Sequence, residues 1–182
     1  VLVGVQDASG SIYNSEGIDP EDLIRYTKVN KNLVKGYPLA SEYPSSDFFG
    51  IDCDILIPAA MGNQITADNA DIVKASLVAE GANGPVDSEG SKVLLKNGVD
   101  VIPDIFCNSG GVIASYFEWL QNRNGEMWSL EEVLEKLENK MKKNFQRMIG
   151  TAEEYKTDWR TAAYIGAIRR IEEAYIQRGI FP

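Results

Sequence analysis

The sequence predicts an α/β fold, a doubly wound parallel sheet that is incomplete at its N-terminus and is followed by a C-terminal helical extension. Four short apolar runs, at 1–5, 54–58, 76–80 and 99–103, are continuous rather than alternating, as in strands buried on both faces of a parallel sheet. Helical segments separate these runs, and only helices follow the last one. A chain of 182 residues with 44% hydrophobic residues can bury the core of one such domain.

The first run ends at Gln6 and Asp7 and is followed by a turn at 8–10. We expect all four runs to be strands of one parallel sheet. Because a natural N-terminus seldom begins inside a strand, we also expect further chain upstream of Val1.

Helix signals lie between the runs. Asp19 is expected to cap a helix that has Pro20 at its first position and runs to about Val29. A second helix is predicted at 66–75, where acids precede a lysine in the order that the helix dipole favours. A third is predicted at 88–97, ended by a glycine.

The remaining chain carries signals of helices only. After a helix at 112–122, Ser129 and Glu132 form a capping box for a long amphipathic helix. Asp158 is expected to cap the last helix and Gly179 to end it. We assign residues 1–107 to the parallel α/β part and residues 108–182 to the helical part.

Composition excludes several classes of function. The net charge of −9 argues against a nucleic-acid partner, and the absence of histidine excludes Ser-His-Asp and Cys-His nucleophiles and histidine-bearing zinc sites. We predict no metal site. No apolar run approaches the ~20 residues that span a bilayer, and the first residues lack a signal-peptide pattern. Cys53 and Cys107 are far apart in apolar contexts, so we expect a disulfide-free, cytoplasmic protein with no membrane partner.

Ligands of open α/β sheets bind at the carboxyl ends of the strands, so the residues that follow each run are the candidates. Asp7, after the first run, could accept hydrogen bonds from a ribose or be an ordinary turn residue. Ala59 and Ala60, after the second, could let a flat ring approach or reflect tight packing. Asn83 follows the third run in a glycine-rich loop, where it offers both donor and acceptor, although the string is also an ordinary turn.

The fourth run leads to the most specific pattern. Asn108 could cap a helix whose first turn contains Gly110 and Gly111, and two glycines cost a helix roughly 1 kcal/mol each. A ligand that passes close to the backbone would explain them. Asn108, Val112 and Ser115 share one helix face, and we predict that Asn108 and Ser115 contact a nicotinamide and a substrate. Cys107 is expected to be a buried thiol rather than a nucleophile.

With these residues in place, the sequence resembles the C-terminal portion of glutamate dehydrogenases, within the glutamate/leucine/phenylalanine/valine dehydrogenase superfamily. The matching strings are VGVQDASGSIYNSEGID at 3–19, CDILIPAAMGNQITADNAD at 53–71, VAEGANGP at 78–85, VIPDIFCNSGGVIASYFEWLQN at 101–122 and DWRTAAYIGAIRRIEEAYIQRG at 158–179. They occur in family order over nearly the whole chain.

The resemblance implies a Rossmann-like domain of an NAD(P)-dependent enzyme that oxidatively deaminates L-glutamate to 2-oxoglutarate and ammonia. Asn83 would contact the nicotinamide ribose and Asn108 the carboxamide. Ala59 and Ala60 would flank the adenosine end of the cofactor. Ser115 would bind the glutamate side-chain carboxylate, with Val112 in the same pocket. The family also implies a homo-oligomer, a hexamer of the simpler microbial type.

The sequence also departs from the family pattern. It contains no G-x-G-x-x-G string, and the family's catalytic lysine and aspartate belong to an N-terminal domain that these residues do not include. We therefore expect no catalytic residue and no turnover in these 182 residues. Asp7 favours NAD, whereas Ser9 could accommodate NADP, so either cofactor stays open. The alternatives are a leucine, phenylalanine or valine dehydrogenase, and a non-catalytic binding or assembly module.

Overall fold

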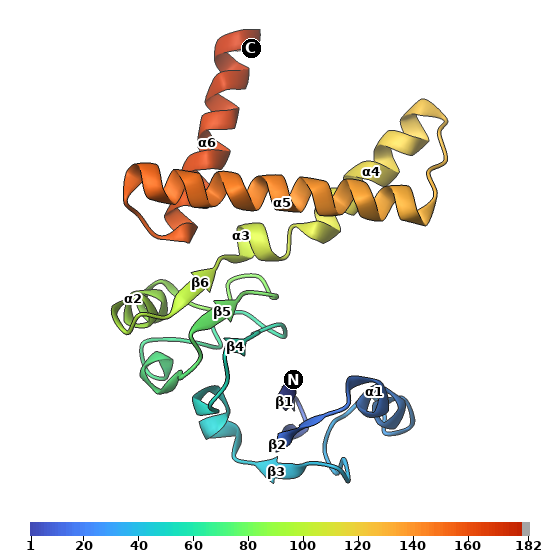
Figure 1. The fold of residues 1–182 in the computed structure, drawn as a ribbon, viewed down its shortest axis with the longest axis vertical. Helices are drawn as coiled ribbons and strands as arrows, with labels where there is room; N and C mark the ends of the chain where they lie inside the picture. The colour runs from blue at the N-terminus through green and yellow to red at the C-terminus, as the bar shows by residue number, and fades with distance from the viewer. Residues whose placement is uncertain (180–182) are drawn as a thin grey trace.

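A computed structural model of the chain describes residues 1–179. Two small sheets lie toward one end and the longest helices toward the other (Figure 1). The strands are Leu2–Asp7 (β1), Gly10–Ile18 (β2), Ser41–Tyr43 (β3), Ile55–Leu56 (β4), Leu77–Ala79 (β5) and Asp100–Ile102 (β6). The α-helices are Pro20–Val29 (α1), Ser88–Lys96 (α2), Asp104–Cys107 (α3), Gly110–Asn124 (α4), Leu130–Tyr155 (α5) and Trp159–Arg178 (α6), with 3-10 turns at Ser45–Gly50 (η1) and Ala70–Ile72 (η2).

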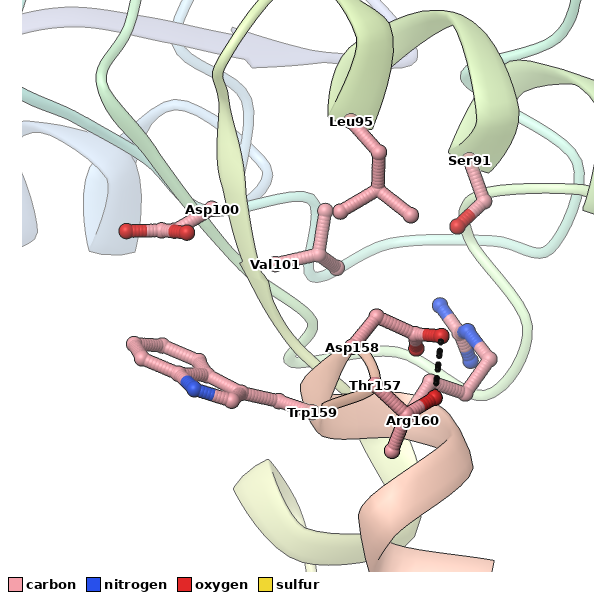
Figure 2. A pocket seen from close by; sticks show the side chains of 8 residues that line it. All are labelled: Ser91, Leu95, Asp100, Val101, Thr157, Asp158, Trp159 and Arg160. Atoms are coloured by element: carbon pink, nitrogen blue, oxygen red, sulfur yellow. Dashed lines mark hydrogen bonds between the residues drawn. The ribbon is translucent and has the colours of Figure 1, made fainter. Parts of the chain in front are cut away.

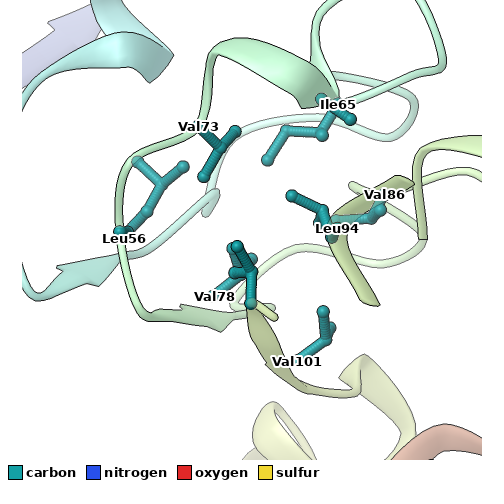
Figure 3. Close-up of a cluster of buried hydrophobic side chains, with 10 residues drawn as sticks. Leu56, Ile65, Val73, Val78, Val86, Leu94 and Val101 are labelled. Atoms are coloured by element: carbon teal, nitrogen blue, oxygen red, sulfur yellow. The ribbon is translucent and has the colours of Figure 1, made fainter. Parts of the chain in front are cut away.

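Three of the four predicted strands form the expected parallel sheet. Its order is β4-β5-β6, with Ile55 opposite Leu77 and Val78 opposite Val101. One face of this sheet packs on a core that includes Leu94 from α2 and Ile65 from the segment between β4 and η2 (Figure 3). Burial of these aliphatic side chains is the main force that holds the sheet and its crossover helix together.

The first strand was wrongly assigned to the parallel sheet. β1 instead pairs antiparallel with β2, and β2 pairs antiparallel with β3, in a separate sheet. The physical reason is the length of the turn, because Asp7 already pairs with Gly10 and so short a connection cannot make a parallel crossover. Gly10 has a φ of 142°, which favours glycine at this reversal of the chain.

The predicted helix at 66–75 is also wrong. Only the short turn η2 forms there, because Asn69 engages the neighbouring backbone with its side chain. Its Oδ1 accepts a hydrogen bond from Thr66 N at 2.8 Å, and its Nδ2 donates to the carbonyl oxygen of Gln64 at 2.9 Å. Such local bonds compete with helical hydrogen bonds and outweigh the charge pattern of the segment.

Most other helix ends follow the sequence signals, the N-terminus of α4 excepted. Asp19 caps α1, Ser129 and Glu132 form the capping box of α5, and Asp158 caps α6. The helix predicted at 112–122 is confirmed as the longer α4, and Gly179 ends α6. α5 crosses the molecule, and α6 packs against its far end and then projects away (Figure 1).

The α/β class with a parallel sheet and C-terminal helices is therefore confirmed. The division at residue 107 stays a prediction, and residues 180–182 of its helical part lie outside the described residues. Within residues 1–179 no helix is long and apolar enough to cross a bilayer.

Candidate functional site

The loops that follow β4 and β5 are joined at the carboxyl edge of the parallel sheet. The carbonyl oxygen of Pro58 accepts hydrogen bonds from Gly81 N at 3.1 Å and from Ala82 N at 3.0 Å. Gly81 passes so close to Ala59 that a Cβ at position 81 would lie 3.0 Å from the Ala59 Cβ. Ala59 and Ala60 are themselves exposed, so only small side chains border these loops on the solvent side.

Asn83 and Asn108, which lie 25 residues apart in the sequence, meet at this edge. The Asn108 Nδ2 donates a hydrogen bond of 2.7 Å to Asn83 Oδ1, and it lies 3.3 Å from the carbonyl oxygen of Ala82. Asn83 is exposed and Asn108 is half-buried. The pair therefore presents amide groups to solvent, and the contact with the Ala82 carbonyl oxygen holds the Asn108 amide in place.

Asn108 reaches this position in a way the sequence did not predict. It was expected to cap α4, but it is the C-terminal cap residue of α3, and Ser109 stands at the N-terminus of α4. Ser109 makes no side-chain capping bond, and its hydroxyl donates instead to the carbonyl oxygen of Phe106 at 2.7 Å. The side-chain amide of Asn108 is therefore free of a capping role and bonds to the loop after β5.

Val112 and Ser115 lie farther along, on α4. Both are exposed, with Val112 75% accessible. Within residues 1–179, Ser115 makes no hydrogen bond to Asn83 or Asn108. Their predicted partnership with the asparagine pair stays a prediction that a bound substrate would have to test.

Asp7 belongs to the other sheet, and its carboxylate is already engaged. One oxygen accepts from Ser9 N at 2.7 Å and from Ser9 Oγ at 2.5 Å, and the other accepts from Val34 N at 2.9 Å. Burial alone would raise the pKa of Asp7, but the hydrogen bonds from Ser9 and Val34 outweigh it and hold the pKa below its ordinary value. The ionised Asp7 therefore links the β1–β2 turn to the loop after α1 through hydrogen bonds.

Sequence reasoning missed an ionic cluster beneath the asparagine pair. Glu80, the residue after β5, is fully buried, and its Oε1 accepts from Arg160 Nη2 at 2.5 Å. Its Oε2 accepts from the backbone N of Asp104 at 2.7 Å. Arg160 also lies 3.4 Å from Asp104 through its Nη1. The available signal was an acid directly after a buried strand, where an unpaired charge would be costly.

The two cysteines are free thiols. Burial raises the pKa of Cys107, and the nearby carboxylates of Glu80 and Asp104 raise it further. Burial also raises the pKa of Cys53. At neutral pH both groups stay protonated, which disfavours a thiolate nucleophile at Cys107. Among residues 1–179 no three metal-binding side chains are grouped together.

One cavity lies on the α6 side of the ionic cluster, with Arg160 in its lining. It has a volume of about 130 Å³ and opens between α2, β6 and the start of α6, where Leu95 and Val101 line it from one side and Asp158 and Arg160 from the other (Figure 2). A shallower hollow of about 420 Å³ is lined by residues 13–15 and 38–41. Neither of these two cavities includes Asn83, Asn108 or Ser115.

Comparison with known proteins assigns this arrangement to a family. The model of the glutamate/leucine/phenylalanine/valine dehydrogenases matches residues 1–179. A glutamate dehydrogenase of Thermotoga maritima is 45% identical over 181 residues, which are 100% of this chain and 43% of that protein. An NAD-specific glutamate dehydrogenase of Staphylococcus aureus is 40% identical over 178 residues, 98% of this chain and 42% of that protein.

Solved structures give the same result. The hetero-hexameric glutamate dehydrogenase of Thermus thermophilus, in its leucine-bound form, matches with a TM-score of 0.89 and 32% identity over 99% of this chain and 42% of that one. The glutamate dehydrogenase of Peptoniphilus asaccharolyticus matches with a TM-score of 0.77 and 38% identity over 94% of this chain and 38% of that one. The chain thus spans less than half the length of these relatives.

Proposed function

Because the chain belongs to the glutamate/leucine/phenylalanine/valine dehydrogenase family, we propose that it is the dinucleotide-binding part of a glutamate dehydrogenase. The whole enzyme would convert L-glutamate to 2-oxoglutarate and ammonia. The observation that carries the proposal is the hydrogen-bonded pair of Asn83 and Asn108 at the carboxyl edge of a parallel sheet, where such folds bind their ligands.

The residues at this edge suit a nicotinamide dinucleotide, which would supply the hydride acceptor. Asn83 would bind the nicotinamide ribose and Asn108 the carboxamide, because their amides offer both donors and acceptors. Ala59 and Ala60 would flank the adenosine end, where their small side chains keep the surface flat. The close packing of Gly81 on Ala59 supports this fit, since a larger side chain would displace the loop.

Ser115 would recognise the side-chain carboxylate of glutamate, with Val112 against its aliphatic part. Both side chains are exposed on α4 and so accessible to a substrate. A hydroxyl at this position favours glutamate over leucine, phenylalanine or valine, because a site built to hydrogen-bond a substrate rejects analogues that lack the group. A pocket for those apolar amino acids is the competing proposal.

The cofactor is proposed to be NAD rather than NADP. The ionised Asp7 would accept a hydrogen bond from a free ribose 2′-hydroxyl and would repel a 2′-phosphate. Its bonds to Ser9 and Val34 fix the carboxylate but leave lone pairs for a further donor. The name of the Staphylococcus aureus relative, an NAD-specific enzyme, supports the same choice.

We also propose that the enzyme is a homo-oligomer, a hexamer by analogy with the hetero-hexameric relative from Thermus thermophilus. A cytoplasmic location stays a prediction from the cysteine pattern, with Cys53 and Cys107 both unpaired.

The test is a spectrophotometric assay of the full-length protein. Glutamate, leucine, phenylalanine and valine are each supplied as substrate, with either NAD⁺ or NADP⁺ as cofactor. We expect NADH formation from L-glutamate, with kcat/KM at least about a hundredfold above that for leucine. Preference for leucine, phenylalanine or valine would overturn the proposed substrate, and preference for NADP⁺ would overturn the proposed cofactor. No turnover with any pair would favour a non-catalytic assembly module. The 182-residue chain alone is expected to give no turnover.

A further inference from the structure

The buried ionic cluster sits directly under the proposed cofactor loops. Glu80 begins the loop that carries Asn83, and Asp104 begins α3, which carries Asn108. Besides the Asn108 contacts, two hydrogen bonds join the two loops (residues 80–85 and 104–108). Asp104 N donates to Glu80 Oε2 at 2.7 Å, and Gly84 N donates to Asp104 Oδ2 at 2.8 Å. In this hydrogen-bonded network Glu80 is buried, and Asn83 and Asn108 lie nearer to solvent.

Arg160 joins both loops from α6, 80 residues away from Glu80 in the sequence. Its guanidinium reaches Glu80 through Nη2 and Asp104 through Nη1, so one planar group spans both carboxylates. The Glu80 side chain is fully inaccessible and that of Arg160 is 25% accessible. A buried carboxylate needs a fixed partner, and Arg160 is the cation that the cluster contains.

On the basis of the proposed function, we infer that Arg160 is a positioning residue for the cofactor. By holding Glu80 and Asp104 together, it fixes the separation of the two loops and so the alignment of Asn83 with Asn108. Arg160 does not touch the nicotinamide itself. Its loss would disturb the nicotinamide end of the site. The adenosine end, beside Ala59 and Ala60, would stay largely intact, because the carbonyl oxygen of Pro58 holds Gly81 and Ala82 there without Arg160.

The experiment compares two ligands in the full-length protein by calorimetry. NADH spans the whole site, whereas ADP lacks both the nicotinamide and the ribose that carries it. In Arg160→Gln we expect the Kd for NADH to rise roughly tenfold, the loss of about one hydrogen bond, while the Kd for ADP changes less than about twofold. Arg160→Lys, which keeps the charge but not the two-pronged geometry, is expected to give an intermediate rise.

Arg169→Gln is the matched control, because Arg169 lies on the same helix and pairs with the exposed Glu154. It should leave both dissociation constants unchanged. Arg160→Gln leaves the buried Glu80 carboxylate without its cationic partner, which by itself destabilises the fold. The double variant Glu80→Gln/Arg160→Gln removes both charges, and we expect it to keep the selective loss of NADH affinity while its Tm stays nearer to that of the wild type.

A second readout needs no ligand. Hydrogen exchange should accelerate at residues 80–85 and 104–108 in Glu80→Gln/Arg160→Gln and not in Arg169→Gln. Equal loss of NADH and ADP affinity, or unchanged exchange in both loops, would overturn the inference while the proposed function stands. If the wild-type protein binds no NADH, the proposed function fails, and the exchange measurement still decides whether Arg160 fixes the loops.

Discussion

At the scale of single residues, the site depends on one contact between two loops. Asn108 donates to Asn83 and lies near two carbonyl oxygens of the same loop, at 3.3 and 3.5 Å. Asn83 is exposed, so water can replace the contact when Asn108 is truncated. A change at this residue should therefore affect a bound cofactor more than it affects the fold.

Asn108→Ala is the direct test of that statement. We expect kcat/KM for NAD⁺ in the full-length enzyme to fall about tenfold or more, because the carboxamide loses its partner, while the thermal midpoint stays close to that of the wild type. Asn139→Ala, at an exposed position on α5, is the matched control and should change neither quantity. Unchanged kinetics in Asn108→Ala would exclude the residue from the cofactor site.

Gly111 allows a test in which stability and binding move in opposite directions. It lies in the first turn of α4, and a Cβ built there meets no atom within 4 Å. Gly111→Ala should therefore stabilise the protein by roughly 0.5–1 kcal/mol, as measured by urea denaturation. If a ligand passes close to this backbone, the same variant should bind NADH or glutamate more weakly. Higher stability with unchanged binding would show that the glycine serves no ligand.

The asparagine pair could be predicted from the sequence because the carboxyl ends of adjacent parallel strands meet at one edge of a sheet. The rule places Asn83 and Asn108 together without any knowledge of their side chains. The bond between Glu80 and Arg160 was beyond reach, since no periodicity links residues 80 positions apart. It depends on where α6 docks, which only the packing of the helices determines.

At the scale of elements, helix ends were predictable where one polar side chain satisfies free backbone groups. The caps at Asp19, Ser129 and Asp158 each accept a hydrogen bond from a backbone N–H of the first turn. Strand direction was not predictable in the same way. The run at 1–5 has the composition of a buried parallel strand, but a turn of two residues dictates the antiparallel partner.

Asp158 gives a pH-dependent prediction at this scale. Its Oδ1 accepts from Thr161 N at 3.0 Å, and its Oδ2 accepts from the Thr161 hydroxyl at 2.7 Å. Burial alone would raise the pKa of Asp158, but the hydrogen bonds from Thr161 outweigh it and lower the pKa. A lowered folded-state pKa means that the ionised cap stabilises the protein above the ordinary pKa of about 4, and that this stability is lost as the pH falls through the lowered value.

Asp158→Ala should therefore reduce the free energy of unfolding by about 1 kcal/mol at neutral pH, and by progressively less below about pH 4. Urea denaturation followed by tryptophan fluorescence measures this stability; Trp159 is the first residue of the helix, and Trp119 and Trp128 also contribute to the signal. Asp71→Ala, at an exposed position, serves as the control. A loss of stability that stays constant down to acid pH would contradict the role of the charge.

At the scale of the whole molecule, a net charge of −9 opposes association, and uncovered apolar surface favours it. The four exposed apolar side chains Tyr164, Ile168, Ile171 and Tyr175 follow one another on α6 at spacings of four, three and four residues, and are 48 to 62% accessible. They share one helix face. β1 and β4 also stand at the ends of their sheets, each with one unpaired edge.

We therefore expect the 182-residue chain on its own to associate, and to do so more strongly as salt screens its negative charge. Sedimentation velocity over a wide range of concentration and ionic strength measures this. The double variant Ile168→Glu/Ile171→Glu should weaken association without lowering the Tm, because both side chains are already exposed. Gln177→Glu adds charge to the same helix without removing apolar surface, and should have a smaller effect. Association that persists in the double variant would point to the sheet edges instead, and a monomer under all conditions would show that the charge prevails over both surfaces.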